Sequence, residues 1–160
     1  MKRTIFLIAL TLFYYIGIFA QATSLTIDLE TPGTLLEKID FKDRSTLQEL
    51  RVTGFINESD LAKMAGLITN GSLKILDLEN ATICSSYSIT NELSTAVFQS
   101  IPQSKHFQKF ILPKTLNTTD LSQLLSSTYL DTLIINGTMT GLVIGGSTGS
   151  SSGTPTGIWE

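Results

Sequence analysis

Residues Leu73–Ile83, LKILDLENATI, carry the clearest structural pattern of the sequence. The apolar residues among them follow the spacing Leu-x-x-Leu-x-Leu-x-x-Ala-x-Ile, beginning with Leu73, Leu76 and Leu78. The step of two from Leu76 to Leu78 is the period of an extended strand, in which alternate side chains point to the same face. The stretch therefore predicts a short strand that buries its leucines on one side.

The same spacing returns three more times in weaker form, and the four starts are separated by 26, 34 and 23 residues. This is the pattern of a leucine-rich repeat, in which neighbouring repeats must stack because none buries its apolar edge alone. We therefore expect an α/β chain, a short leucine-rich repeat solenoid with a parallel sheet on one face. The expected strands carry Leu47, Leu50 and Val52; Leu73, Leu76 and Leu78; Phe107, Phe110 and Leu112; and Leu130, Leu133 and Ile135.

The segment before the first repeat predicts a strand and a helix that cap the solenoid. Leu25–Leu29 alternates apolar and polar residues, as a half-buried strand does. A helix is expected to open at Thr31–Pro32 or at Thr34, with Glu37 as the reciprocal cap. Together they would cover the apolar face and strand edge that a first repeat leaves exposed.

The clearest helix is expected immediately after the first repeat. Asn57 can cap it, and Asp60, three residues on, can complete a capping box. Apolar residues then follow at helical spacing from Leu61 onwards. Asn70–Gly71 can end this helix through a left-handed residue, just before the strongest repeat begins.

Residues 1–22 have the form of an export signal. Lys2 and Arg3 precede the apolar stretch Ile5–Phe19, and Ala20–Ala22 is an A-x-A cleavage site. Cleavage after Ala20 and cleavage after Ala22 both remain open. An uncleaved anchor is the alternative, but the apolar stretch is shorter than the ~20 residues that a span needs. We expect an exported protein, secreted, periplasmic or at the cell surface, with no membrane insertion after signal cleavage.

Charge limits the classes of partner. Of the 11 basic residues, Lys2 and Arg3 belong to the signal, so the mature chain has 9 basic and 14 acidic residues and a net charge of −5. Binding to nucleic acid needs basic groups that displace counterions from phosphates, so this balance argues against it. An anionic membrane surface is disfavoured for the same reason.

The chain offers little for catalysis, cofactors or metals. His106 is the only histidine and is expected at the surface, while Cys84, the only cysteine, is expected to be a small buried residue. Asp77 and Glu79 flank Leu78 and could imitate a catalytic carboxylate pair, but on a strand they more commonly form a polar face. Neither metal-ligand spacing nor a phosphate-binding motif is found. We expect a protein that is not an enzyme and has no cofactor.

The candidate binding surface is the face formed by residues that flank the inward leucines. These residues fall into three columns across the expected strands. None is aromatic, which disfavours stacking against sugars and favours contact with protein. The columns are Glu49, Ile75, Lys109 and Thr132; Arg51, Asp77, Ile111 and Ile134; and Thr53, Glu79, Pro113 and Asn136. From them we select Arg51, Asp77, Glu79, Lys109, Ile111, Pro113 and Ile134, in which the apolar members would form a small patch beside the charges.

Several segments resemble secreted BspA-like leucine-rich repeat proteins of Bacteroides and related bacteria. The resemblance spans residues 25–139. It implies a secreted or cell-surface protein that adheres to another protein, such as a host extracellular-matrix or cell-surface protein, and it brings no catalytic residues. Thr132, in Asp131-Thr132-Leu133, also resembles the O-glycosylation acceptor of exported Bacteroides proteins. The matching segments are Leu25–Leu29, Pro32–Leu35, Leu47–Gly54, Ile56–Asp60, Leu76–Ile83, Ala96–Phe98 and Ile111–Pro113.

The chain therefore divides into a signal peptide (1–22), a leucine-rich repeat domain with its cap (23–139) and a tail (140–160) rich in Gly, Ser and Thr. Such a composition is typical of a flexible segment. The alternative for the tail is a final irregular coil, with a strand at Met139–Ile144. For function, the alternatives to protein binding are a carbohydrate-binding module and a truncated structural or capping fragment without a ligand of its own.

Overall fold

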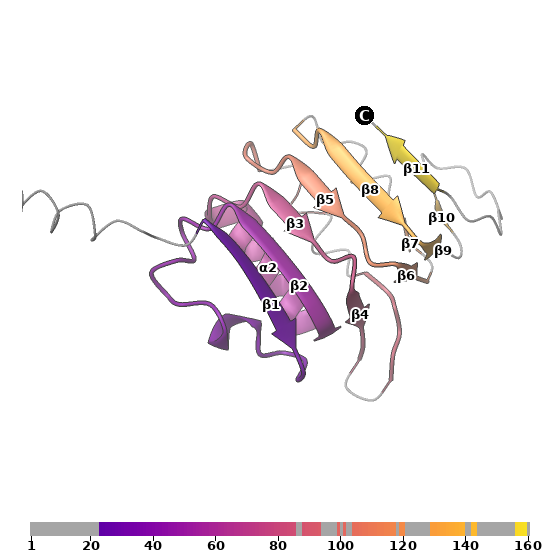
Figure 1. Cartoon of the computed structure of the whole chain (residues 1–160), viewed down its shortest axis with the longest axis horizontal. Coiled ribbons are helices and arrows are strands. Elements are labelled where there is room, and N and C mark those ends of the chain that lie inside the picture. Colours follow the sequence, from indigo (N-terminus) through magenta and orange to yellow (C-terminus); the bar gives the residue numbers. More distant parts are fainter. Residues whose placement is uncertain are drawn as a thin grey trace, which may run out of the picture.

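The computed structural model describes residues 23–85, 88–93, 99, 101, 104–117, 119–120, 129–139, 142–143 and 156–159. In this part the chain is α/β, with one α-helix and a mostly parallel sheet (Figure 1). The expected signal peptide and the Ala96–Phe98 motif lie outside the described residues.

The main sheet has the strand order β1-β2-β3-β5-β8-β11, and β4 also pairs with β2. All of these pairs are parallel except that of β11 with β8. The strands of this sheet are β1 (Ser24–Leu29), β2 (Glu49–Ile56), β3 (Ile75–Asp77), β4 (Ala81–Ile83), β5 (Lys109–Ile111), β8 (Thr132–Asn136) and β11 (Thr156–Trp159). Two small parallel pairs join β6 (Thr115–Leu116) to β9 (Thr138–Met139), and β7 (Thr119–Asp120) to β10 (Leu142–Val143).

The register of the sheet confirms the strand positions expected from the leucine spacing. Leu50, Leu76, Phe110 and Leu133 are successive Cα partners across β2, β3, β5 and β8. All four are buried, so each strand places an apolar residue beside the apolar residue at the equivalent position of its neighbour. This alignment builds the central row of the core.

Each of these strands begins with the same hydrogen-bond arrangement. One carbonyl of the preceding strand segment accepts two successive backbone N–H groups of the next, at 2.8 to 3.0 Å. The arrangement holds the start of every strand at one level, because a slip by one residue would break both bonds. The accepting carbonyls belong to Thr23, Gln48, Lys74 and Gln108, and their donors are Gln48 and Glu49, Lys74 and Ile75, Gln108 and Lys109, and Asp131 and Thr132.

The helix α2 (Glu58–Asn70) lies behind β1 and β2 (Figure 1). Its expected start is confirmed: the side chain of Asn57 accepts from the N–H of Asp60, and the carboxylate of Asp60 accepts from the N–H of Asn57. Its expected end is wrong in detail, because Gly71 has φ −106° and not a left-handed conformation. Glycine is needed there for a steric reason, because a Cβ would lie 2.5 Å from the carbonyl oxygen of Leu67.

The N-terminal cap is partly as expected. The strand is confirmed as β1, but the expected helix is a single 3-10 turn, η1 (Leu35–Glu37), and Thr34 makes no side-chain cap. The N–H groups of Gly33 and Leu35 donate instead to the carboxylate of Asp60, at 2.6 and 3.0 Å. Because Asp60 satisfies these donors from α2, the turn does not need a cap of its own.

The segment expected to be a flexible tail contains strands. β10 pairs with β7, and β11 pairs with β8 so that Ile158 lies opposite Ile134. The alternative, a final irregular coil with a strand at Met139–Ile144, agrees better with the structure, because β9 and β10 lie in or next to that range. The composition of the tail did not indicate β11. Its four residues pair with the backbone edge of β8 and carry no leucine-rich repeat spacing of their own.

We predict that truncating the central row is costly. Leu76 is fully buried between Leu50 and Phe110. Leu76→Ala should lower the free energy of unfolding by roughly 2 to 5 kcal/mol, measured by urea denaturation, because it removes buried apolar surface and leaves a cavity. A loss below about 1 kcal/mol would contradict the stacked core.

We also predict that Asp60 joins the cap to the helix. It is 0% exposed and accepts from three backbone N–H groups, those of Gly33, Leu35 and Asn57. Asp60→Asn keeps one accepting oxygen and should destabilise by about 1 to 3 kcal/mol, and Asp60→Ala by more. The matched control is Glu58→Gln, an exposed acid in the same helical turn, which should change stability by less than about 1 kcal/mol. Equal effects of Asp60→Asn and Glu58→Gln would contradict this role.

Candidate functional site

The exposed face of the sheet carries two of the expected columns as rows across neighbouring strands. The first row is Glu49, Ile75, Lys109 and Thr132, and the second is Arg51, Asp77, Ile111 and Ile134. Both follow from the register, because residues adjacent to a buried leucine point to the opposite face. The rows bring residues from four separate sequence segments within reach of one ligand.

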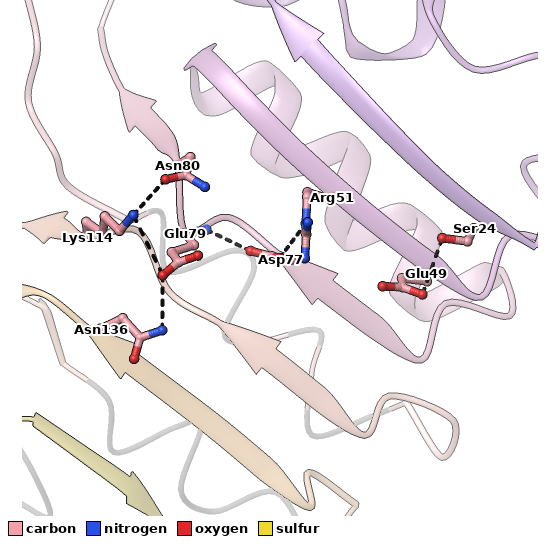
Figure 2. Close-up of polar contacts among 8 residues, drawn as sticks. All are labelled: Ser24, Glu49, Arg51, Asp77, Glu79, Asn80, Lys114 and Asn136. Atoms are coloured by element: carbon pink, nitrogen blue, oxygen red, sulfur yellow. Dashed lines mark hydrogen bonds and ion pairs between the residues drawn. The ribbon is translucent and has the colours of Figure 1, made fainter.

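Arg51 and Asp77 form an ion pair between β2 and β3. The Nε of Arg51 donates to Oδ2 of Asp77 at 2.7 Å, and Oδ1 of Asp77 accepts from the backbone N–H of Glu79 at 2.9 Å (Figure 2). Asp77 is only 3% exposed, whereas about half of the Arg51 side chain is exposed. Asp77 therefore positions Arg51 and does not itself offer a carboxylate to a ligand, which corrects its expected place on the exposed surface.

A second polar group joins the ends of β3 and β8. The Oε1 atom of Glu79 accepts from the Nδ2 of Asn136 at 3.1 Å and lies 3.7 Å from the Nζ of Lys114, which donates to Asn80 at 2.8 Å (Figure 2). Sequence reasoning did not select Lys114, although it directly follows the expected strand residue Pro113. A hollow of about 310 Å³ lies beside this group and is lined by Glu79, Asn80, Ala81, Thr82, Ile89, Asn91, Lys114 and Thr115.

Three partly exposed isoleucines lie beside these polar groups. Ile75, Ile111 and Ile134 come from β3, β5 and β8, and Ile111 is the register partner of Ile134. We call these three residues the isoleucine patch. Pro113, expected in the patch, is buried and is not available to a ligand. It lies beyond the end of β5, so the alternation of a strand, which predicted its exposure, no longer applies.

Lys109 and Thr132 adjoin the isoleucine patch in the first row, which also contains Ile75. Both are partly exposed and are register partners in β5 and β8. The hydroxyl of Thr132, the candidate O-glycosylation acceptor, is thus on a strand within the candidate face and not on a loop. A glycan there would cover part of the patch.

One aromatic residue lies just outside the three expected columns. Phe55 is 45% exposed near the end of β2 and follows Arg51 and Thr53 at the two-residue period of the strand. Continuing the column analysis by one more step would have found it. The face is therefore not free of aromatic residues.

Cys84 lies in a separate hollow of about 550 Å³ near the start of α2. It is partly buried, where full burial was expected, and its thiol donates to the carbonyl oxygen of Ile56 at 3.2 Å. Burial raises the pKa of Cys84, and the negative charge of Asp60 raises it further. The thiol is therefore protonated at neutral pH and is not prepared as a nucleophile. The hollow is lined by Asn57, Glu58, Ser59, Leu61, Ile83, Cys84, Ser85, Thr90, Glu92 and Leu93.

We next consider the remaining residues that could take part in catalysis or metal binding. His106 is exposed, as expected. In the described ranges, no three His, Cys, Asp or Glu side chains gather in a way that could hold a metal ion. Over the same ranges, no helix has the length and apolar character needed to cross a membrane.

In comparisons with known proteins, no family model and no curated protein matches the chain. The resemblance to BspA-like proteins therefore depends on the sequence motifs alone.

Proposed function

We propose that the protein is an exported leucine-rich repeat protein that binds another protein through the exposed face of its sheet. The isoleucine patch, which lies beside two positioned polar groups, carries this proposal. It presents apolar surface from three strands, next to the Arg51–Asp77 pair and to Glu79 and Lys114. An apolar centre with a polar rim is the usual composition of a protein interface.

The repeat nature of the chain is supported by two observations that recur strand after strand. Equivalent apolar residues are register partners, and the same pair of hydrogen bonds opens each strand. Both are what stacked copies of one structural unit would produce.

The charges of the face favour a specific orientation of the partner. Buried Asp77 holds the Arg51 guanidinium by its Nε, which leaves the remaining guanidinium donors for a carboxylate or carbonyl of the partner. The partly exposed Glu79 carboxylate and the Lys114 ammonium add charges of both signs near the ends of β3 and β5. The hollow beside them can accept one partner side chain. Such paired charges contribute more to specificity than to affinity.

Export and the kind of partner come from the sequence. Residues 1–22 have the form of a signal peptide, and the resemblance to BspA-like proteins suggests adhesion to a host extracellular-matrix or cell-surface protein. The proposed protein has no catalytic activity, no cofactor and no affinity for nucleic acid.

The test begins with a screen of the purified protein against immobilised extracellular-matrix proteins. The double variant Ile111→Asp/Ile134→Asp should weaken any saturable protein binding at least about tenfold, because it places two charges at the centre of the interface. Ala62→Asp, which adds one such charge to the exposed side of α2, is the control and should bind normally. Circular dichroism should show that both variants fold. Folded patch variants that bind like the unchanged protein would overturn the proposed site.

Carbohydrate binding is the second candidate, and Phe55 is the observation that favours it. An exposed aromatic ring on a strand can stack against the apolar face of a sugar. On a glycan array, Phe55→Ala should abolish sugar binding and leave protein binding unchanged if this candidate is correct. Glycan binding that survives Phe55→Ala would contradict it.

A further inference from the structure

β1 is the first strand of the main sheet, and in the described part of the chain it pairs only with β2. The carbonyl of Thr23 accepts from the N–H groups of Gln48 and Glu49, so it points toward β2. In a parallel ladder, alternate residues direct both backbone groups to the same side. The backbone N–H and C=O groups of Ser24, Thr26 and Asp28 therefore point away from the sheet.

The sequence of β1 does not protect this outward edge. Ser24–Leu29 contains no proline, no lysine and no bulge, which are usual devices that prevent an edge strand from pairing, and its one charged residue is Asp28 near its end. Its six residues are paired with β2 without interruption, so the edge is straight enough to accept another strand.

The edge is complementary to itself. In an antiparallel pair of two β1 strands centred on Thr26, each Thr26 faces the Thr26 of the other copy. Ser24 then faces Asp28, so the acidic side chains are kept apart, and Leu25 faces Ile27 on the core side. The outward backbone groups of Thr26 would bond in both directions, as in a hydrogen-bonded antiparallel pair.

Apolar surface is available next to the edge. Leu25 is only partly buried and packs at the margin of the core. A strand added to β1 would cover the exposed part of Leu25, which adds apolar burial to the backbone hydrogen bonds.

We propose that the outer edge of β1 is a self-association site, at which the β1 strand of a second copy adds in antiparallel orientation about Thr26. The product is a twofold dimer whose two sheets form one continuous sheet. The dimer leaves the isoleucine patch of each copy open, so it does not depend on the proposed ligand.

Sedimentation velocity of the purified protein over a wide concentration range tests the dimer. The mass should rise from monomer to dimer with concentration. Thr26→Pro removes the central outward N–H but no bond to β2, because proline is tolerated where an edge N–H faces solvent. It should remain monomeric at every concentration, with an unchanged circular dichroism spectrum.

Thr26→Val is the matched control, because it alters the side chain but keeps the N–H. It should dimerise like the unchanged protein. A second measurement places the contact: Thr26→Cys, in a Cys84→Ser background, should form a disulfide-linked dimer on mild oxidation, and Ala62→Cys on α2 in that background should not. A protein that stays monomeric at high concentration, equal dimerisation of the proline and valine variants, or equal cross-linking of the two cysteine variants would overturn the proposal.

Discussion

The parallel pairing of β2, β3, β5 and β8 in one fixed register is the constraint on which the rest of the structure depends. Leu50, Leu76, Phe110 and Leu133 can all be buried only if every strand begins at the same level. A slip of one residue would turn each strand's apolar residues to solvent and its polar residues inward. The paired hydrogen bonds at the strand starts oppose such a slip. The exposed rows, and with them the candidate binding face, follow from this register.

The N-terminal end is stabilised differently, by one buried carboxylate. Asp60 belongs to α2, which follows β2, and accepts from the N–H groups of Gly33 and Leu35, which precede β2, so it joins the helix to the cap segment. Gly54 makes a second close approach: it has φ +80°, and a Cβ there would lie 2.3 Å from the carbonyl oxygen of Leu29. Any other residue would push β2 away from β1. The cap segment therefore depends on Asp60, and the close approach of β1 and β2 depends on Gly54.

The sequence predicted those features that depend on side-chain period and on local hydrogen bonds. The two-residue step of the leucines gave the strands and their register, and Asn57 with Asp60 gave the start of α2. It did not predict features that depend on distant groups. Asp60 satisfies donors of the cap turn from α2, Asp77 is buried and paired with Arg51 of the neighbouring strand, and β11 is held by the edge of β8. Pro113 was misplaced because alternation was continued past the end of β5.

Hydrogen exchange of single backbone amides tests the central claim most directly. The N–H groups of Ile75, Lys109 and Thr132 open successive strands and donate to Gln48, Lys74 and Gln108 at 3.0 Å. If one register joins the whole stack, these three amides should be strongly and similarly protected from exchange. Rapid exchange at Lys109 and Thr132 beside slow exchange at Ile75 would contradict the account, because the stack would then end at β3 and the exposed rows would not exist.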